Sequence, residues 1–168
     1  MSFFENLYSF PIVADAAGVK YPAAAKWVER GDLVMRPEDR QVIGRGGRKM
    51  LSPNTSLQFI LAAELNRRGL KTSEACEAAL NFAHYGQIKG QKGAAMNRNP
   101  GRLFVNGLTL LFIDRENPDR SSVEHFSGLE RVKEISTRLD AVYLEWLFLS
   151  RLGMLGIDAV AAVQEMKE

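Results

Sequence analysis

The chain has 168 residues, of which 46% are hydrophobic and 25% are charged, as in ordinary globular proteins. Its single cysteine, Cys76, excludes a disulfide framework and a zinc site built on cysteine pairs within one chain, so a reducing cytoplasm is the simplest compartment. The sequence shows no signal-peptide pattern. Its longest apolar stretch, residues 141–149, contains Glu145 and is too short to cross a bilayer.

The net charge of +2 is distributed unevenly along the chain. Residues 1–102 contain 15 Lys or Arg and 9 Asp or Glu, a balance of +6, whereas residues 103–168 contain 7 and 11, a balance of −4. A basic first part and an acidic second part indicate a polyanion-binding module joined to a module with a different role.

The segment FPIVADAAGVKYPAAAKWVERGDL, residues 10–33, predicts two short helices joined by a tight turn. The first helix is expected over 11–17, and Gly18 supplies the turn because glycine takes a positive φ without penalty. The second helix is expected to begin at Pro22 and to end near Gly31. Its small residues, with a cation and an aromatic in mid-helix, suit a helix that lies in the major groove of DNA. A helical hairpin in some other small fold is the alternative.

Residues 34–52, VMRPEDRQVIGRGGRKMLS, predict a small β-hairpin. Apolar pieces at 33–35 and 42–43 flank a turn at 37–39. The GRGGR stretch is basic and has no bulky side chains, so its backbone can approach a phosphate backbone closely, although it also fits a solvated loop. It lacks the glycine and lysine spacing of a nucleotide-binding P-loop.

Two further helices are expected before residue 85. Ser52 and Pro53 fit the start of a helix that runs to about residue 68 and packs one face, including Leu57 and Ile60, on a core. Thr72 or Ser73 is expected to cap the next helix. Residues 86–102 are rich in glycine and cations, which predicts a basic linker or loop between a domain of residues 1–85 and a module of residues 103–168.

The second module is predicted to contain strands followed by an apolar helix. Asn106-Gly107 between apolar runs indicates a hairpin with a two-residue turn, and residues 123–126 fit a further strand. Apolar residues between 129 and 139 have helical spacing. The segment 139–155 reads as a helix that is apolar around more than half its circumference, so it is expected to be buried or shared with a second subunit. The expected dimer contacts are Val142, Tyr143, Trp146, Leu147 and Leu149. Asp158 is expected to cap a terminal helix that reaches Met166.

Taken in order, these elements resemble the winged helix-turn-helix DNA-binding domain of the MerR family and its excisionase-like relatives. GVKYPAAAKWVERGDL resembles the family's turn and recognition helix, and GGRKMLS resembles the end of the wing, the hairpin that grips the DNA backbone. SLQFILAAELNRRGLKTSEACEAAL resembles the two supporting helices. The resemblance covers roughly residues 8–85. The chain has Ala23-Ala24-Ala25 where the family usually has Thr-x-Arg, and Leu51 where the wing end has an aromatic residue. It lacks the long coiled-coil helix of MerR dimers.

The expected fold is therefore α+β: a MerR-like winged helix-turn-helix followed by a small α+β module with an apolar helix. The expected DNA contacts are Tyr21, Ala24, Lys26 and Arg30 around the recognition helix, and Arg36, Arg40, Arg45, Arg48 and Lys49 in the wing. Cations on phosphates supply affinity more than specificity. Sequence reading then depends on contacts with thymine methyl groups, on Lys26 with guanine and on groove shape. Trp27 is expected to pack in the core against Ile12 and Val13.

The leading functional hypothesis is a sequence-specific transcription regulator that binds double-stranded DNA as a homodimer and is cytoplasmic and nucleoid-associated. One alternative is a phage-type architectural, excision or packaging DNA-binding protein. Another is an adaptor that binds other proteins through its winged helix. An enzyme, a cofactor and a metal site are not expected, because His84 and His125 lie in different modules and Cys76 is about 12 Å from His84 along a helix. An effector ligand cannot be named from the sequence, since nothing polar marks a pocket in the second module.

Overall fold

The computed structural model describes residues 2–41, 48–85, 98–126 and 140–168. These residues form an α+β protein with two three-stranded antiparallel sheets. The α-helices are α1 (Phe10–Ala17), α2 (Tyr21–Glu29), α3 (Pro53–Arg67), α4 (Thr72–Leu80), α6 (Leu144–Leu152) and α7 (Ala159–Met166). The short helical segments are η1 (Phe3–Glu5), η2 (Asn81–Tyr85), η3 (Pro118–Arg120) and η5 (Gly153–Leu155), of which η2 is a π-helix. None of the described helices has the length and apolarity needed to span a membrane.

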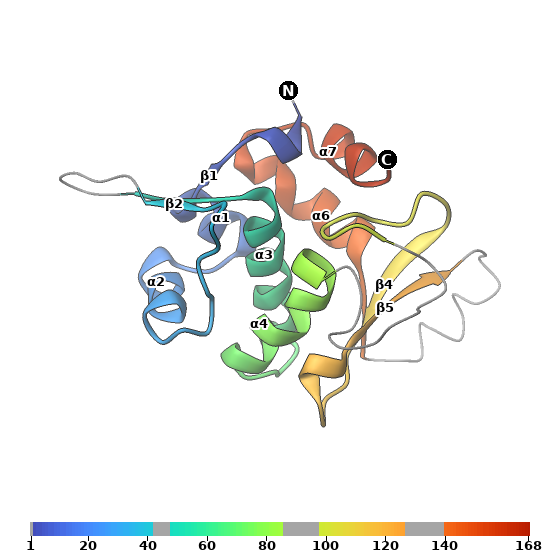
Figure 1. Cartoon of the computed structure of the whole chain (residues 1–168), viewed down its shortest axis with the longest axis horizontal. Coiled ribbons are helices and arrows are strands. Elements are labelled where there is room, and N and C mark those ends of the chain that lie inside the picture. Colours follow the sequence, from blue (N-terminus) through green and yellow to red (C-terminus); the bar gives the residue numbers. More distant parts are fainter. Residues whose placement is uncertain (1, 42–47, 86–97, 127–139) are drawn as a thin grey trace.

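Helix α3 lies at the centre of the molecule, with α1 and α2 on one side and the second sheet on the other (Figure 1). Eleven of its fifteen residues are buried, so the expectation that it packs only one face on a core is wrong. The reason is its position, because α1, α4 and η2 all pack against it. Ser52 caps the helix as expected, accepting a hydrogen bond from Thr55 N to its side-chain oxygen at 3.3 Å.

Helices α1 and α2 form the predicted pair, joined by a turn in which Gly18 has φ 71°. Trp27 is 6% exposed, which confirms its place in the core. Its ring lies 5.0 Å, centroid to centroid, from that of Phe59 on α3, so this contact fixes α2 against the central helix. The predicted packing partner Val13 is buried in the same core, whereas Ile12 is 46% exposed.

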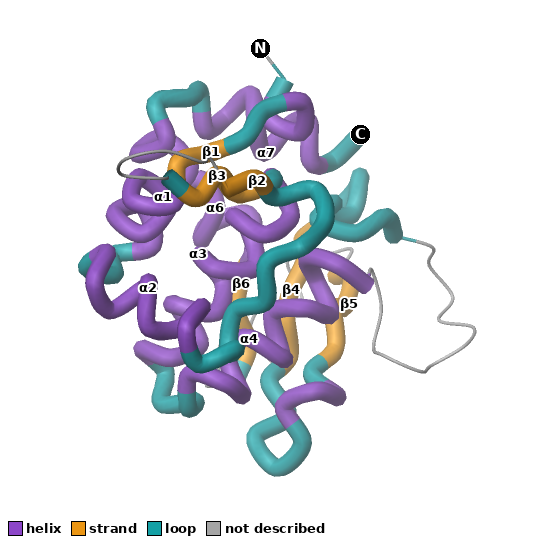
Figure 2. The backbone as a smooth tube through the Cα atoms, turned by 60° about the vertical axis from the view of Figure 1, so that its left-hand side comes forward, coloured by secondary structure: helices purple, strands orange, loops and turns teal. Residues whose placement is uncertain are grey.

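The first sheet has the order β1-β3-β2, with β1 at Tyr8–Ser9, β2 at Arg40–Gln41 and β3 at Lys49–Leu51 (Figure 2). Strands β2 and β3 are the predicted hairpin, but the sequence placed it too early. Residues 33–35 form no strand. The turn at 37–39 is instead closed by Asp39, whose carboxylate accepts a hydrogen bond from Arg36 N at 2.6 Å. The paired strands are therefore residues 40–41 and 49–51, and the predicted strand at 42–43 lies outside the described residues.

The second sheet has the order β5-β4-β6, with β4 at Leu108–Phe112, β5 at Ser122–Phe126 and β6 at Ala141–Tyr143. Strand β5 confirms the strand expected at 123–126. The hairpin expected around Asn106-Gly107 is wrong, because β4 pairs with β5 and β6 and not with residues 103–105. Val142 and Tyr143 belong to β6, not to the apolar helix, which begins at Leu144. The helical spacing between 129 and 139 lies outside the described residues.

One hydrophobic cluster extends from Phe3 to Met166 and includes residues of both predicted domains. The two ends of the chain meet in it (Figure 1). Glu165 on α7 accepts hydrogen bonds from Phe3 N at 2.7 Å, Phe4 N at 3.2 Å and the Ser2 hydroxyl, and Asp158 caps α7 as expected. The division at residues 85 and 103 stays a prediction, and separating the two parts would cut through this cluster.

The described part of the predicted linker is packed against the fold. The Arg98 guanidinium donates to the carbonyl oxygens of Phe82 at 3.1 Å and Arg102 at 2.7 Å, and it lies 4.7 Å from the centroid of the Phe82 ring. Burial lowers the pKa of Arg98 to about 10. Residues 98–102 thus hold the end of η2 in place, while residues 86–97 lie outside the described part of the chain.

Candidate nucleic-acid interface

Helix α2 presents one face to solvent and one to the core. Its exposed residues are Tyr21, Pro22, Ala23, Lys26 and Glu29, and Arg30 follows at its end. Ala24 is fully buried, so its predicted contact with DNA is wrong. The physical reason is helix periodicity: Ala24 lies three residues before Trp27 and shares its inward face. The exposed face therefore carries only a few groups able to form hydrogen bonds.

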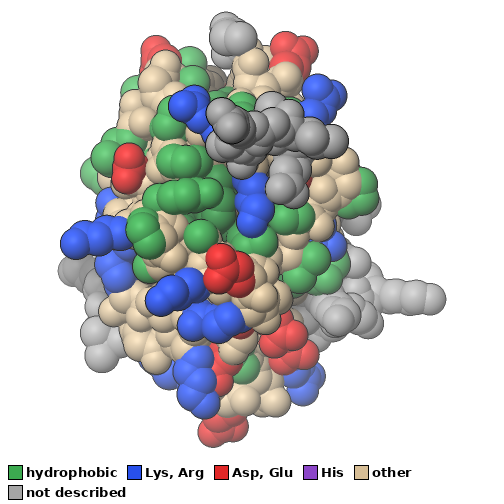
Figure 3. All heavy atoms as spheres, turned by 90° about the vertical axis from the view of Figure 1, so that its left-hand side faces the viewer, with side chains coloured by type: hydrophobic (Ala, Val, Ile, Leu, Met, Phe, Trp, Pro, Cys, Tyr) green, Lys and Arg blue, Asp and Glu red, His purple; other side chains and the backbone are tan. Residues whose placement is uncertain are grey.

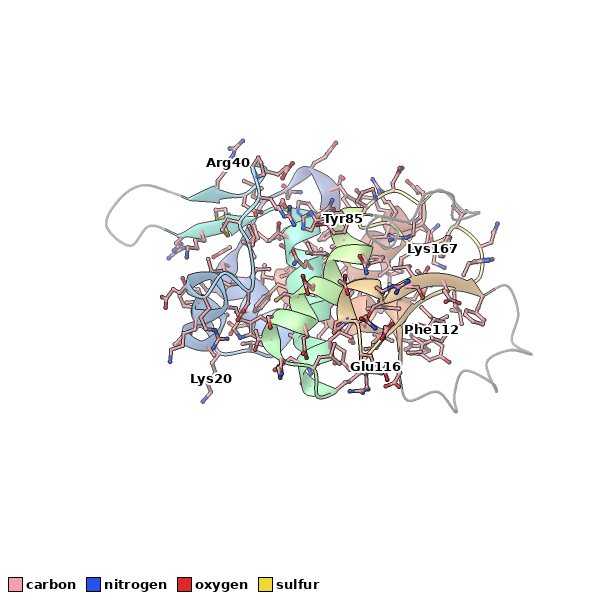
Figure 4. The ribbon with its side chains drawn as sticks, turned by 60° about the horizontal axis from the view of Figure 1, so that its bottom comes forward. Lys20, Arg40, Tyr85, Phe112, Glu116 and Lys167 are labelled. Carbon is pink, nitrogen blue, oxygen red and sulfur yellow. The ribbon has the colours of Figure 1, made fainter. Side chains whose placement is uncertain are left out.

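Several predicted cations lie at the same end of the molecule as α2. Arg40 on β2 and Arg48 before β3 are exposed, and Lys49 is half-buried. Figure 4 shows Arg40 and Lys20 pointing outward on the side of the molecule that carries α2, whereas Phe112 lies on the other side. Lys20, the N-cap residue of α2, was not selected from the sequence, although its position beside Tyr21 was the available signal.

The remaining predicted cations are less available. Arg30 pairs with Asp32 at 3.0 Å, and the two side chains are 56% and 16% exposed. Arg36 is half-buried, and its Nε is buried without a partner among the described residues. Arg45 lies outside the described residues. Fewer cations are therefore accessible at this end than the sequence predicted.

Seen from this end, hydrophobic side chains gather near the middle of the surface, with Lys and Arg side chains around them (Figure 3). On α1, on α2 and just after α2, the exposed apolar residues Ile12, Tyr21 and Val34 have exposures of 46%, 37% and 54%. An apolar centre with a cationic rim can contact base methyl groups while the rim contacts phosphates. It can equally receive an apolar surface of a protein.

Asp39 connects the β2–β3 pair to α3. Its Oδ1 accepts from Ser52 N at 2.6 Å, and its Oδ2 accepts from the Thr55 hydroxyl at 3.0 Å, in addition to the bond from Arg36 N. One carboxylate thus connects the turn before β2, the residue after β3 and the first turn of α3. The sequence marks Asp39 only as a turn residue, because its partner Ser52 lies thirteen residues away.

His84 lies on η2 beneath the same connection. Burial, reinforced by the Arg36 charge, lowers the pKa of His84 to about 4 against the opposing effect of Asp39 and Glu38. Its imidazole is therefore neutral near pH 7, and its Nε2 is buried without a partner among the described residues. His84 borders a cavity of about 470 Å³ whose other lining residues include Arg40 and Asn54.

The predicted dimer residues divide into two groups. Val142 is 1% exposed and Leu147 is 8% exposed, so the chain's own core already covers them, against the prediction that they contact a second copy. Trp146 is 71% exposed and Leu149 is 38% exposed, while Tyr143 is half-buried. The difference arises because Val142 belongs to a strand whose register with Leu111 turns it inward.

A groove of about 700 Å³ runs beside Trp146. Its apolar wall is formed by Leu108, Val142, Tyr143, Trp146 and Leu147, and its polar residues are Glu64, Arg68, Ser150 and Arg151. The expectation that nothing polar marks a pocket here is therefore wrong. Ser150 and Arg151 lie on α6 itself, whereas Glu64 on α3 and Arg68 at its end come some eighty residues earlier in the chain. The sequence therefore did not show that these four residues meet.

Cys76 is buried on α4, as expected, and burial raises the pKa of its thiol to about 12, with a further increase from the Asp32 charge. A thiol held in its neutral form is a poor nucleophile and a poor metal ligand. Among the residues that the structure describes, no group of three or more His, Cys, Asp or Glu is arranged to hold a metal ion. Comparison of the chain with protein-family models, curated proteins and solved structures finds no match.

Proposed function

We propose that the chain is a sequence-specific DNA-binding protein with a MerR-like winged helix-turn-helix, in which α2 enters the major groove and the β2–β3 wing lies on the backbone. The observation that carries the proposal is the common placement of the exposed face of α2 and the cations of the β2–β3 pair at one end of the molecule (Figure 4).

The order and support of the elements favour this function. The turn at Gly18 sets α2 after α1, and the contact between Trp27 and Phe59 holds α2 on α3. Asp39 ties both strands of the wing to the start of α3. A reading helix and a wing that are both fixed to one central helix are preorganised for a single surface, which reduces the entropy lost on binding.

The composition of α2 shifts the balance of contacts toward the wing. With Ala24 buried, the exposed first turn of α2 offers Tyr21, Pro22 and Ala23, which have one hydroxyl and otherwise apolar surface. Lys26 is the cation within the helix and is exposed on the same face. In this proposal the wing cations supply much of the affinity, and α2 supplies specificity through apolar contacts and Lys26.

The test is alanine substitution followed by gel-shift titration. Lys26→Ala and Arg48→Ala each remove an exposed cation of the proposed interface, so each weakens DNA binding several-fold. Arg120→Ala is the matched control because Arg120 is exposed on η3, away from α2 (Figure 1). Unchanged affinity in both test variants removes the assignments of helix and wing together.

A protein-binding adaptor is the second candidate, and the exposed Ile12, Tyr21 and Val34 favour it. These apolar side chains suit a protein partner at the same end of the molecule. Absence of any DNA affinity at low salt selects the adaptor, because non-specific electrostatic binding is strongest there. Higher-order assembly along DNA, in place of a discrete footprint, selects the architectural or packaging alternative.

A homodimer and a regulatory, nucleoid-associated role in the cytoplasm belong to the same proposal. Two-fold symmetry then requires a palindromic or repeated site. Since Val142 and Leu147 are buried, the proposed dimer contact includes fewer residues than the sequence predicted. A clean monomer in size-exclusion chromatography with light scattering, at micromolar concentration, contradicts the dimer and leaves the DNA-binding proposal to its own test.

A further inference from the structure

The groove beside Trp146 lies where the central helix meets the C-terminal elements. Glu64 of α3 and Arg68 at the end of that helix form one side, and β4, β6 and α6 supply the other. Its volume of about 700 Å³ falls in the range of roughly 300–1,000 Å³ that is typical of small-molecule sites. Such sites have a mainly apolar lining with a few polar groups at one place, and this groove has the same character.

The charges at the polar end of the groove are unequal. Glu64 accepts hydrogen bonds from Arg68 Nε at 3.0 Å and from Arg67 Nη2 at 2.9 Å, so two guanidinium groups share its carboxylate. Burial acts to raise the pKa of Glu64, but the hydrogen bonds from Arg68 and Arg67 lower it on balance, and it stays ionised at neutral pH. No further carboxylate lines the groove among the described residues.

Arg151 is the cation of the groove that has no anionic partner among the described residues. Its guanidinium forms no hydrogen bond or ion pair with any described residue, and its Nε is buried without a partner. A partly buried guanidinium without an anion carries a desolvation cost that a bound carboxylate or sulfonate would relieve. The net charge of the lining is therefore positive, from Arg68 and Arg151 against Glu64.

We propose that this groove binds a small organic anion with an apolar, preferably aromatic, body. The acid group of the ligand lies on Arg151, and its body packs on Trp146 and the adjoining wall. Trp146 is 71% exposed without a ligand, and covering its ring supplies much of the apolar contribution. The charge surplus selects an anion over a cation or a neutral molecule.

Arg151, which lines the groove, also lies beside the turn between α1 and α2. A Cβ placed on Gly18 would lie 3.4 Å from Arg151 Nη1, so the guanidinium that receives the anion is next to the hairpin that contains α2. A ligand that moves Arg151 therefore acts on the proposed DNA-reading hairpin. This coupling rests on the proposed function, whereas binding of the ligand does not, and the two are measured separately.

The test uses two dyes of nearly the same shape, 8-anilinonaphthalene-1-sulfonate, which is anionic, and N-phenyl-1-naphthylamine, which lacks the sulfonate. Fluorescence titration of the whole chain without DNA is expected to show saturable binding with tighter affinity for the sulfonate. Arg151→Gln is expected to weaken the sulfonate about tenfold and to leave the neutral dye unchanged. Trp146→Ala is expected to weaken both dyes.

Matched controls are Arg120→Gln, an exposed cation outside the groove, and Met154→Ala, an apolar residue outside it that is 55% exposed. Both should bind the dyes as the wild type does. Circular dichroism checks the folding of each variant, and if Trp146→Ala does not fold, the comparison of the two dyes on Arg151→Gln decides alone.

Three results overturn the proposal. One is the absence of saturable binding, and another is an equal affinity for the sulfonate in wild type and Arg151→Gln. The third is a dimer in sedimentation velocity that excludes the dye and becomes a monomer in Trp146→Ala. Trp146 then serves the proposed homodimer contact in place of a ligand, and the occupant of the groove is a second copy of the chain. DNA binding measured on the same variants shows whether the proposed function survives independently.

Discussion

The salt dependence of DNA binding tests the proposed interface quantitatively. Apart from Arg36, whose Nε is buried, five cations near α2 and the wing have no ion pair with a described residue: Lys20, Lys26, Arg40, Arg48 and Lys49. If each neutralises one phosphate of duplex DNA, log K falls with log salt at a slope of about −4.5 for each bound copy. Raising KCl from about 50 to about 200 mM then weakens binding roughly 500-fold.

Lys26→Ala removes one of these contacts, so the slope becomes about −3.6 and the same change in salt weakens binding roughly 150-fold. The assay is fluorescence anisotropy of a labelled duplex at several KCl concentrations, with Arg120→Ala as the control that keeps the wild-type slope. A dimer that engages both half-sites doubles the slope to about −9. A salt-independent affinity, or an unchanged slope in Lys26→Ala, refutes the reasoning.

Two further predictions concern the connection between the wing and α3. Asp39→Ala removes a carboxylate that accepts hydrogen bonds from Ser52 N and two other groups. We expect the free energy of unfolding, measured by urea denaturation, to fall by about 2 kcal/mol. Substitution of the exposed Glu38 by Gln serves as the control, and an equal loss there contradicts the role of Asp39. His84 has a folded pKa of about 4 against 6.5, so the unfolded chain takes up its proton first and stability falls as the pH drops from 6.5 toward 4. Between pH 7.5 and pH 5 this costs about 2 kcal/mol in the wild type, and His84→Gln should show a correspondingly smaller loss; equal losses in both proteins rule the mechanism out.

The sequence correctly predicted the turns and helix starts that depend on short-range interactions. Gly18, Ser52 and Asp158 each marked a turn or helix start that the structure contains, because positive φ and side-chain capping depend on only a few neighbouring residues. The burial of Trp27 was also predicted correctly. Its main partner was not, since Phe59 lies on a helix thirty residues later.

The errors share one cause, which is that strand pairing and burial depend on distant parts of the chain. Asn106-Gly107 has the local pattern of a hairpin turn, yet β4 pairs with strands that begin at Ser122 and Ala141. Val142 fits an apolar helix by hydropathy, but pairing with Leu111 makes it part of a strand. The conformational preference of a short segment is overridden where it can pair with a distant strand.

The candidate site shows the same division. The sequence by itself determined the α1–turn–α2 pair, the cations of the wing region and the apolar character of α6, because composition and short-range periodicity encode them. Only the tertiary structure decided that Ala24 faces the core, that Asp39 joins the wing to α3 and that Arg151 is left without an anion beside Trp146. Those facts depend on which side chains meet across long separations in sequence, and the packing of the whole fold determines that.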